Sequence, residues 1–480
     1  MNTPKTAQTL TPPGDGILLS HGYFLADDPR EQMIMKPYPP LGLLYLSSWL
    51  DLHGIENEVY DTTFSTKEHF QQYLLATRPR LLALYVNLMT KLNVLEIVRF
   101  VRAQEGLKNT RIVFGGPDVT HNVEDYLKNG ADILVLGEGE QTLLEIARLS
   151  PGSQDLQTKG PSIQGLAFLL PDGSVFKTAA REKVRDIDTL PFPNRSKIDL
   201  QRYLDVWKKA HGHSAVSLST QRGCPYTCRW CSTAVYGQSY RRRSPENVVD
   251  EIVWLQKNYD FDLIWFVDDV FTVSHKWLRE FRDELQNRSL KVRFECITRA
   301  DRLTGEVLDV LKEAGCFRVW IGAESGSQRI IDAMDRRVDV GQVRAMIQSA
   351  RRAGIEAGTF IMLGYPGETE ADIRETVRHL KESNPDLFTI TVAYPIKGTG
   401  LYEEVQASSF SELPWAGRSD RELDFPRTYP RRYYDFAVRW TQNSVYLYKA
   451  RLAGKAMTFK GLKLLTKVVA ARAGMWASRF

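Results

Sequence analysis

The chain of 480 residues contains little cysteine: five residues in all, and none before position 224. A small, odd number of cysteines is a poor disulfide framework, so we expect thiols that serve metal binding or catalysis in a reducing compartment. Long apolar runs are also missing, because no stretch approaches the ~18 residues of a membrane-spanning helix. The polar start of the chain lacks the apolar core of a signal peptide. These absences predict a cytoplasmic protein.

The chain has no strong overall charge, but its positive charges are concentrated at one end. The net charge is +5, whereas residues 426–480 alone hold twelve Lys or Arg against one acid, which leaves −6 for residues 1–425. With 43% hydrophobic residues the chain can bury cores, and its length exceeds the ~100–200 residues of a single domain. We predict a disordered segment at 1–14, followed by two or three folded domains.

Residues 15–150 alternate apolar runs with amphipathic helical segments. The runs GILLSHGYF, ENEVYD, RLLALYVNL, RIVFGGPD and ADILVLGEGE predict five strands. Such βα repeats are typical of a doubly wound, Rossmann-like parallel sheet, in which ligands bind beyond the carboxyl ends of the strands. Glycines gather after those predicted strand ends, where they let a bulky cofactor approach the backbone.

A second βα series is predicted further along the chain. Residues 151–214 first form a linker with a hairpin, because LAFLLPDGSVF contains a Pro-Asp-Gly turn. Residues 215–405 then show six βα repeats. Because a complete TIM barrel has eight repeats, we predict a partial (β/α)6 TIM-like barrel. Residues 406–480 complete this α/β chain as a basic, mostly helical C-terminal region.

Three of the five cysteines, Cys224, Cys228 and Cys231, have a C-x3-C-x2-C spacing just after the first strand of the second series. Three thiolates can bind three irons of a [4Fe–4S] cluster and leave the fourth iron open for another ligand. A zinc site is the less favoured alternative, because structural zinc takes four closed ligands and only His211 and His213 stand nearby.

The residues around the cysteines extend this pattern and resemble the radical S-adenosylmethionine (SAM) superfamily. Arg222 and Gly223 precede the triplet, and Tyr226 and Trp230 lie within it. The resemblance implies that the open iron of the cluster chelates SAM and that an electron from the cluster cleaves it to a 5′-deoxyadenosyl radical. It implies no catalytic side chain beyond the cluster and SAM.

The same resemblance implies SAM contacts at successive strand ends of the partial barrel. The second strand ends in an acidic pair, the fourth ends in GAESG, and FIMLGYPGET covers the fifth. An arginine after the fourth strand would pair with the methionyl carboxylate, for which its planar guanidinium is suited. The residues implied as SAM contacts are Asp268, Asp269, Glu295, Arg299, Gly322, Glu324, Ser325, Arg336 and Phe360.

Residues 15–150 resemble the cobalamin (B12)-binding module that precedes this barrel in one subgroup of the superfamily. The resemblance rests on PPLGLLYLSSWLDLHG, GGP and GEGE. The residues it implies as cobalamin contacts are Pro39, Gly42, Asp61, Gly115, Gly116, Pro117, Gly137 and Gly139. The D-x-H-x-x-G motif that supplies a histidine to cobalt in some cobalamin proteins is absent. We therefore expect cobalamin without a histidine ligand; the alternative is a degenerate domain that binds none.

The cysteines outside the triplet bear on the choice of subgroup. Cys296 lies in an apolar predicted strand and Cys316 follows a helix end, so both are predicted to be buried structural thiols. The tRNA-methylthiolating relatives carry a second three-cysteine cluster in an N-terminal domain. Because residues 1–223 contain no cysteine, that interpretation is disfavoured.

Residues 455–476 form an amphipathic helical pattern. The apolar side carries Phe459, Leu462, Leu465, Val469 and Trp476, and another side carries Lys460, Lys463 and Lys467. Such a helix can lie on an anionic membrane surface. Equally, it can pack on the barrel with its basic face in water. Nucleic-acid binding is the least favoured interpretation, because no recognition fold accompanies these charges.

Together these patterns predict a cobalamin-dependent radical SAM enzyme that methylates an unactivated carbon of a small substrate. If the tail contacts a membrane, a lipophilic substrate is favoured: a hopanoid, an isoprenoid lipid or a tetrapyrrole. Expected partners are an electron donor such as ferredoxin or flavodoxin and, through residues 426–480, the inner face of the membrane. Two alternatives stay open: radical cyclisation, rearrangement or oxidation without methyl transfer, and a non-catalytic cobalamin-binding sensor.

Overall fold

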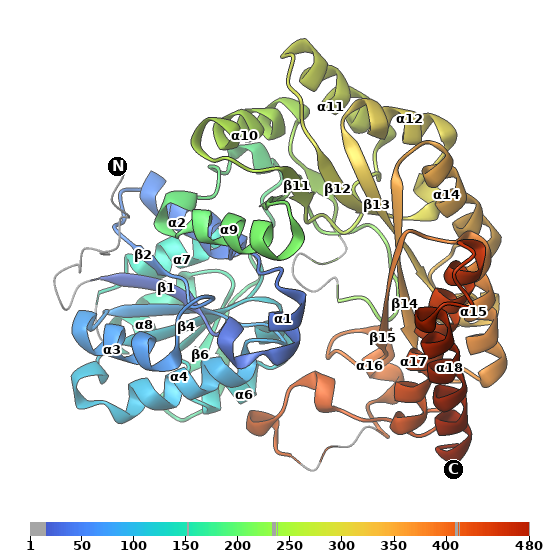
Figure 1. Cartoon of the computed structure of the whole chain (residues 1–480). Coiled ribbons are helices and arrows are strands. Elements are labelled where there is room, and N and C mark those ends of the chain that lie inside the picture. Colours follow the sequence, from blue (N-terminus) through green and yellow to red (C-terminus); the bar gives the residue numbers. More distant parts are fainter. Residues whose placement is uncertain are drawn as a thin grey trace. The chain divides into compact units, whose positions relative to one another are not determined.

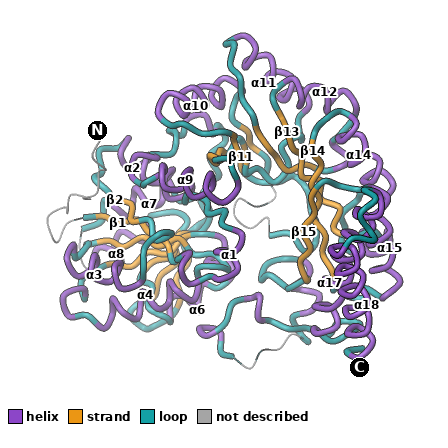
Figure 2. Tube along the Cα trace, in the orientation of Figure 1, coloured by secondary structure: helices purple, strands orange, loops and turns teal. Residues whose placement is uncertain are grey.

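The computed structural model describes residues 16–150, 153–232, 237, 239–408, 411 and 413–479, so the predicted disordered segment 1–14 lies outside the described residues. The chain divides into two compact units. The first comprises the described residues up to Ser214 together with the segment Leu413–Ser419, and the second comprises the rest of the described residues from Ala215 onward. Figures 1 and 2 show the secondary structure of both units.

The first unit is built on a seven-stranded sheet with the order β2-β1-β3-β4-β5-β6-β7. Strands β1 to β5 pair in parallel, whereas the hairpin β6–β7 joins the edge at β5 in antiparallel fashion. The strands are β1 (Ile17–His21), β2 (Glu58–Tyr60), β3 (Leu81–Tyr85), β4 (Arg111–Gly115), β5 (Ile133–Val135), β6 (Leu166–Leu169) and β7 (Val175–Lys177).

Helices cover both faces of this sheet (Figure 1). The helices of this unit are α1 (Pro29–Ile34), α2 (Leu41–Leu52), α3 (Lys67–Thr77), α4 (Lys91–Ala103), α5 (Pro117–His121), α6 (Val123–Lys128), α7 (Glu140–Ala147), α8 (Ser153–Lys159) and α9 (Leu200–His211). Helices α2 and α7 share a core with Leu19 and Val113, and α3, α4 and α6 share a second core with Leu18 and Phe114. Because successive strand residues point to opposite faces, these two cores confirm the predicted doubly wound fold.

The second unit is built on six parallel strands in the order β15-β14-β13-β12-β11-β8. Helices α10, α11, α12, α14 and α15 follow one another along one side of this sheet (Figure 1). This open βα series confirms the predicted partial barrel. The strands of this unit are β8 (Ala215–Leu218), β9 (Gln221–Arg222), β10 (Arg241–Arg242), β11 (Leu263–Phe266), β12 (Phe294–Thr298), β13 (Cys316–Glu324), β14 (Glu356–Leu363) and β15 (Leu387–Val392). Its helices are α10 (Pro245–Asn258), α11 (His275–Asn287), α12 (Gly305–Glu313), α13 (Gln328–Ala333), α14 (Val340–Arg352), α15 (Glu370–Ser383), α16 (Gly400–Val405), α17 (Arg431–Leu452) and α18 (Phe459–Ala477).

Local sequence signals explain where several helices begin and end. Ser244 caps α10 by accepting a hydrogen bond from the amide of Asn247, and a proline occupies the first helical position. Helix α9 ends at His211 and is capped by Gly212, whose φ of +75° favours glycine. Thr369 and Asp372 form a capping box at the start of α15. These caps fix where the helices that connect the strands begin and end.

The C-terminal region forms two long helices. Helix α17 packs against α15, β14 and β15, and α18 packs along α17. Of the helices that the structure describes, none is long and apolar enough to cross a membrane.

The fold predicts different effects on stability for two glycine substitutions at the carboxyl edge of the first sheet. Gly116 has a φ of +119°, and an added Cβ would lie 2.3 Å from the backbone oxygen of Val86. Gly116→Ala should therefore lower the free energy of unfolding by about 2 kcal/mol, measured by chemical denaturation. Gly42 lies in the first turn of α2 with no atom within 4 Å of an added Cβ. Gly42→Ala should leave stability unchanged or slightly higher; equal losses in the two variants would contradict this account.

Candidate functional site

The cysteine triplet lies in a loop whose two ends are joined by a short ladder. Strand β9 pairs antiparallel with β10, so the chain returns beside its starting point after the triplet. Gly223, directly before Cys224, has a φ of +79°, and an added Cβ would lie 1.7 Å from the backbone oxygen of Ser239. Only glycine fits at this position, which explains the glycine that directly precedes the first cysteine.

A buried carboxylate, Asp268, organises the start of this loop. One of its oxygens accepts hydrogen bonds from the backbone amides of Thr220 and Gln221, at 2.8 and 3.2 Å, and the other accepts one from the Thr220 hydroxyl. Burial raises the pKa of Asp268, and the charge of Arg242 opposes this effect. Because both carboxylate oxygens have protein partners, Asp268 acts here as a support for the loop.

The three cysteine thiols supply a donor set that fits an iron–sulfur cluster. Cys224 is buried, and Cys228 and Cys231 are partly exposed. Burial raises the pKa of Cys231 to about 12, and Asp269 and the other two thiols add to the effect, so the sulfurs lie within electrostatic reach of one another. Within the described residues, no group of three His, Cys, Asp or Glu side chains is placed to hold a metal ion. A cluster makes a different demand, because each thiolate binds its own iron.

Two buried arginines lie beside Cys228. Nη1 of Arg299 and Nη1 of Arg336 are each 3.7 Å from the Cys228 Sγ. Arg299 also stacks on Tyr226, 3.9 Å from the ring centroid, and donates to the backbone oxygen of Arg336 at 2.9 Å. A pocket of about 220 Å³ opens at these side chains. Both guanidinium groups can therefore donate to this sulfur.

Arg336 connects the cysteine loop to the end of β13. Its Nη2 donates to the backbone oxygen of Gly322 at 2.8 Å and lies 3.8 Å from Oε1 of Glu324. Its Nε has no partner among the described residues. Glu324 has a φ of +63°, a conformation that is uncommon outside glycine and that is often found at binding sites. Burial raises the pKa of Glu324, against the charges of Arg336 and Arg299. Ser325 follows it and is also buried.

The other predicted SAM residues lie at neighbouring strand ends. Glu295 is buried and accepts hydrogen bonds from Nη1 of Arg318 at 2.9 Å and from Nε1 of Trp320 at 3.0 Å. Trp320 stacks on Phe360, with ring centroids 5.1 Å apart. Asp269 is exposed, unlike its neighbour in the acidic pair, and raises the pKa of two of the cysteine thiols. Asp269 therefore lies near the cysteines, whereas the carboxylate of Glu295 is hydrogen-bonded to side chains of the neighbouring strand β13.

Glu368 was not among the predicted site residues. It lies in the loop after β14 and is fully buried. One oxygen accepts a hydrogen bond from the amide of Gly364 at 2.6 Å, and the other has no partner among the described residues. Burial raises its pKa to about 8, and Asp372 adds to the shift. The segment FIMLGYPGET contains this residue, but no pattern in it marks a carboxyl group as buried.

The predicted cobalamin residues gather at the carboxyl edge of the first sheet. Along this edge lie Pro39 and Gly42 around the start of α2, Gly115 at the end of β4, Gly116 and Pro117 at the start of α5, and Gly137 and Gly139 between β5 and α7. Leu46 of α2 lies 3.2 Å from the place of an added Cβ on Gly139. Helix α2 therefore borders the glycine loop that follows β5.

Asp61, the remaining predicted cobalamin residue, is held within the protein. Its Oδ1 lies 3.0 Å from Nε2 of His21, and its Oδ2 accepts a hydrogen bond from Tyr203 at 2.6 Å. The other ring nitrogen of His21 accepts from the amide of Tyr23 at 3.1 Å. Both nitrogens of His21 thus have protein partners.

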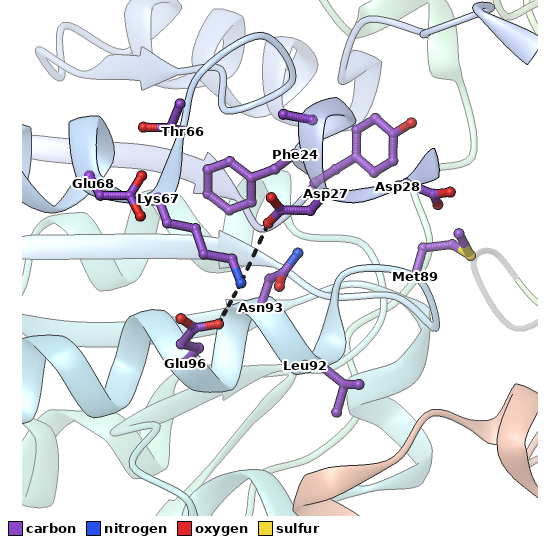
Figure 3. Close-up of a pocket in the computed structure, with 12 residues that line it drawn as sticks. Phe24, Asp27, Asp28, Thr66, Lys67, Glu68, Met89, Leu92, Asn93 and Glu96 are labelled. Atoms are coloured by element: carbon purple, nitrogen blue, oxygen red, sulfur yellow. Dashed lines mark hydrogen bonds and ion pairs between the residues drawn. The ribbon is translucent and has the colours of Figure 1, made fainter. Parts of the chain in front are cut away.

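A separate pocket of about 780 Å³ lies on the same unit, between the segment after β1 and helices α3 and α4 (Figure 3). Lys67 reaches across it to Glu96 at 2.6 Å and to Asp27 at 3.5 Å (dashed lines in Figure 3). None of the residues that line this pocket is among the predicted cobalamin contacts.

Two segments of the chain match known families. Residues 34–147 match the sequence profile of the B12-binding domain, and residues 218–380 match that of the radical SAM superfamily. The chain is a radical SAM protein with a B12-binding domain. The first match contains every residue predicted to contact cobalamin, and the second contains the cysteine triplet and every residue predicted to contact SAM. Both resemblances drawn from the sequence are confirmed.

This radical SAM protein is similar in sequence to several known proteins. It is 28% identical to an uncharacterized methyltransferase of Pyrococcus horikoshii, over 77% of this chain and 79% of that protein. It is 26% identical to the anaerobic magnesium-protoporphyrin IX monomethyl ester cyclase of Rubrivivax gelatinosus, over 77% of this chain and 66% of the cyclase. It is 23% identical to the hopanoid C-3 methylase of Methylococcus capsulatus, over 75% of this chain and 67% of the methylase.

The radical SAM protein also shares its fold with a solved structure. The cobalamin-dependent S-adenosylmethionine radical enzyme OxsB, with aqua-cobalamin bound, superposes with a TM-score of 0.71 over 97% of this chain and 72% of that one. The two sequences are 17% identical. At this identity, the likeness shows a common fold.

The role of Asp268 predicts a difference between two adjacent carboxylates. Asp268→Asn loses at least one acceptor for the Thr220 and Gln221 groups, so iron bound per chain after anaerobic reconstitution should fall at least about two-fold. Asp269→Asn is the matched control and should retain its iron, because no described side chain depends on Asp269 to hold the loop. Loss of iron in Asp269→Asn alone would reverse the assignment.

Glu368 predicts a pH dependence of stability. Its pKa in the folded chain is about 8, above the ordinary value of 4.5, so the folded state holds a proton that the unfolded state has lost. The contribution of Glu368 to the free energy of unfolding should therefore fall as the pH rises from about 4.5 to about 8, by up to ~1.4 kcal/mol per pH unit. Glu368→Gln cannot ionise, so the stability difference between wild type and this variant should change across that window.

Glu370→Gln is the control for this measurement. Arg472 and Arg374 lower the pKa of Glu370 to about 2 although burial opposes them, so its contribution is lost only as the pH falls below about 4.5. The difference between wild type and Glu370→Gln should therefore stay constant from about pH 5 to pH 8. A constant difference for Glu368→Gln over the same range would show that Glu368 is ionised in the folded protein.

Proposed function

We propose that this chain is a cobalamin-dependent radical SAM enzyme that methylates an unactivated carbon of a small, lipophilic substrate. The observation that carries this proposal is the meeting of the cysteine loop with Arg299, Arg336 and Glu324 in a chain that also has a B12-binding domain. When bound, the cluster, SAM and cobalamin supply a 5′-deoxyadenosyl radical and a transferable methyl group. The protein positions these groups and excludes water from them.

In this proposal the thiolates of Cys224, Cys228 and Cys231 hold a [4Fe–4S] cluster. The guanidinium groups of Arg299 and Arg336 beside Cys228 oppose the build-up of negative charge from three thiolates. The ladder of β9 and β10 keeps the loop closed at its base. Asp268 supports the loop from below and is assigned to positioning.

We propose that the charged SAM contacts are complementary to the charged groups of SAM. Asp269 and Glu324 are carboxylates near the cysteines and suit the amino group and the ribose of SAM. Arg336 has an Nε without a partner among the described residues, and this donor suits the methionyl carboxylate. Gly322 leaves room beside the Arg336 guanidinium, because an added Cβ would lie 2.3 Å from Nη2. Phe360 and the buried Ser325 complete the proposed set, and Glu295 supports it through Trp320.

The glycine loops at the edge of the first sheet are the proposed cobalamin site. Gly137 has a φ of +90°, and no atom lies within 4 Å of an added Cβ. An added Cβ on Gly42 would likewise have no atom within 4 Å. Open backbone of this kind admits a bulky ligand. Because Asp61 and His21 are bonded to each other, we propose that cobalamin binds here without a histidine ligand.

Radical chemistry without methyl transfer is the second candidate function. It is supported by the similarity to a magnesium-protoporphyrin cyclase, which is comparable in extent to the similarity to the methylases. A non-catalytic cobalamin sensor would have no use for the arginine and carboxylate groups beside the cysteines. A hopanoid, an isoprenoid lipid or a tetrapyrrole is the proposed substrate class. The proposed partners are a one-electron donor such as ferredoxin or flavodoxin and, through residues 426–480, a membrane surface.

The proposal is tested on protein purified and reconstituted without oxygen in the presence of hydroxocobalamin. About four irons and one cobalt per chain are expected. Addition of dithionite and SAM should yield both 5′-deoxyadenosine and S-adenosylhomocysteine. Deoxyadenosine without cobalt would favour radical chemistry without methyl transfer, and a full cluster without deoxyadenosine would contradict the enzyme function.

A cysteine substitution separates the proposed cluster from the structural thiols. Cys228→Ala should lose most of its iron and all deoxyadenosine formation, because one of three iron ligands is gone. Cys296→Ala is the matched control, because this thiol is fully buried in β12 and does not belong to the triplet. Cys296→Ala should keep wild-type iron content, measured by the absorbance of the cluster and by iron analysis. Equal iron in the two variants would contradict the assignment of the triplet.

A further inference from the structure

Helix α18 buries one side against its own unit and leaves a row of large apolar residues exposed on another. Gly461, Ala471 and Met475 are the buried positions of this helix, and their spacing places them on one face. The large apolar residues that stay exposed on α18 or just before it are Met457 (84% exposed), Phe459 (84%), Leu462 (45%), Leu465 (43%), Val469 (61%) and Trp476 (77%). The apolar side predicted from the sequence therefore faces solvent, where burial of its surface by a partner is favourable.

The orientation of α18 is fixed by specific contacts with its own unit. Gly474 lies against the ring of Phe436 in α17, so closely that an added Cβ would be 2.4 Å from it. Arg472 forms an ion pair with Glu370 at the start of α15. Rotating the helix to bury its large residues would break both contacts. The exposed face is thus a property of the packed helix, which Figure 1 shows lying along α17 in dark red.

A groove adjoins this exposed face. Its volume is about 760 Å³, and its lining includes Trp440, Val469 and Trp476 together with Arg374 and Arg479. Apolar and aromatic side chains thus meet guanidinium groups at the edge of one surface. Aromatic rings with a basic rim are typical of proteins that lie at a membrane–water interface.

The charge of the region selects an anionic partner. Residues 426–480 hold twelve Lys or Arg against one acid. Lys460, Lys463 and Lys467 are exposed on α18 beside the apolar face. The width of one helix, about 10 Å, is close to the Debye length at physiological salt. Salt therefore does not fully screen these lysines from the charges of a surface that the apolar face contacts. A second copy of this chain would bring the same positive charges together, which is unfavourable.

We infer that the exposed face of α18 (Met457, Phe459, Leu462, Leu465, Val469 and Trp476) docks on the surface of an anionic phospholipid membrane. The helix lies in the plane of the membrane, with the apolar side chains inserted among the lipids and the basic side chains near the head groups. This docking rests on the membrane contact proposed for residues 426–480, and it uses residues outside the proposed active site, so its test does not depend on the proposed chemistry. It would deliver a lipophilic substrate to this unit from the membrane.

The inference is tested by sedimentation of the full-length holoprotein with vesicles. Vesicles of phosphatidylcholine with about one third phosphatidylglycerol should retain the protein, and vesicles of phosphatidylcholine alone should retain much less, because the charge attraction is absent. The double variant Phe459→Ser/Trp476→Ser should lower the partition coefficient at least ten-fold. The triple variant Lys460→Glu/Lys463→Glu/Lys467→Glu should lower it at least ten-fold on the anionic vesicles. Iron content and deoxyadenosine formation of both variants should match those of the wild type.

A matched control removes exposed apolar side chains elsewhere. Met33 and Leu52 lie on the first unit and are 82% and 62% exposed, so Met33→Ser/Leu52→Ser should bind vesicles as the wild type does. Equal loss in this control, or equal binding to neutral and anionic vesicles, would overturn the inference. So would a concentration-dependent dimer that Phe459→Ser/Trp476→Ser abolishes while vesicle binding is unchanged. Vesicle binding is measurable even if no SAM cleavage is found, which separates a failure of this inference from a failure of the proposed function.

Discussion

One buried carboxylate, Asp268, holds the start of the cysteine loop through its hydrogen bonds. Asp268 follows β11. Its two oxygens accept hydrogen bonds from two backbone amides and one hydroxyl group of the segment that follows β8. Parallel neighbouring strands end at the same edge of a sheet, so a side chain after one strand can support the loop after the next. The ladder of β9 and β10 then closes this loop, and Gly223 admits the returning backbone.

The far side of the loop is anchored at the opposite end of the sheet. The amide of Arg229 donates to the backbone oxygen of Met334 at 3.1 Å, and its oxygen accepts from the amide of Leu401 at 2.8 Å. Trp230 packs in a core with Met334, Tyr365 and Leu401. The loop therefore spans the strand ends of the partial barrel from β8 to the region after β15. A loop held at both sides can keep three thiols in place before any metal binds, which lowers the entropy cost of binding.

Charge balance explains why arginines accompany the cysteines. The site brings together three thiols and the carboxyl groups of Asp269 and Glu324. The other two thiols and both carboxyl groups raise the pKa of Cys231, and burial raises the pKa of Glu324. Arg299 and Arg336 are the opposing charges. Both are tied to the backbone or to Asp301, so they stay in place when the protonation of the thiols changes. The site thus sets two fixed positive charges against its thiols and carboxyl groups.

The sequence by itself determined the elements and the chemistry that depend on local patterns. Hydrophobic periodicity located the strands of both sheets, and the spacing of Cys224, Cys228 and Cys231 indicated the cluster, because residues close in sequence are close in space. Tertiary structure alone decided which of the marked side chains are free. Three of the predicted carboxylates are hydrogen-bonded within the protein: Asp268 to Thr220, Glu295 to Arg318 and Asp61 to His21. These partners lie between 23 and 48 residues away in sequence. It also decided that α18 turns Gly461 and Met475 inward and Phe459 and Trp476 outward. Periodicity identifies the faces of a helix, but the shape of the neighbouring surface determines which face is buried.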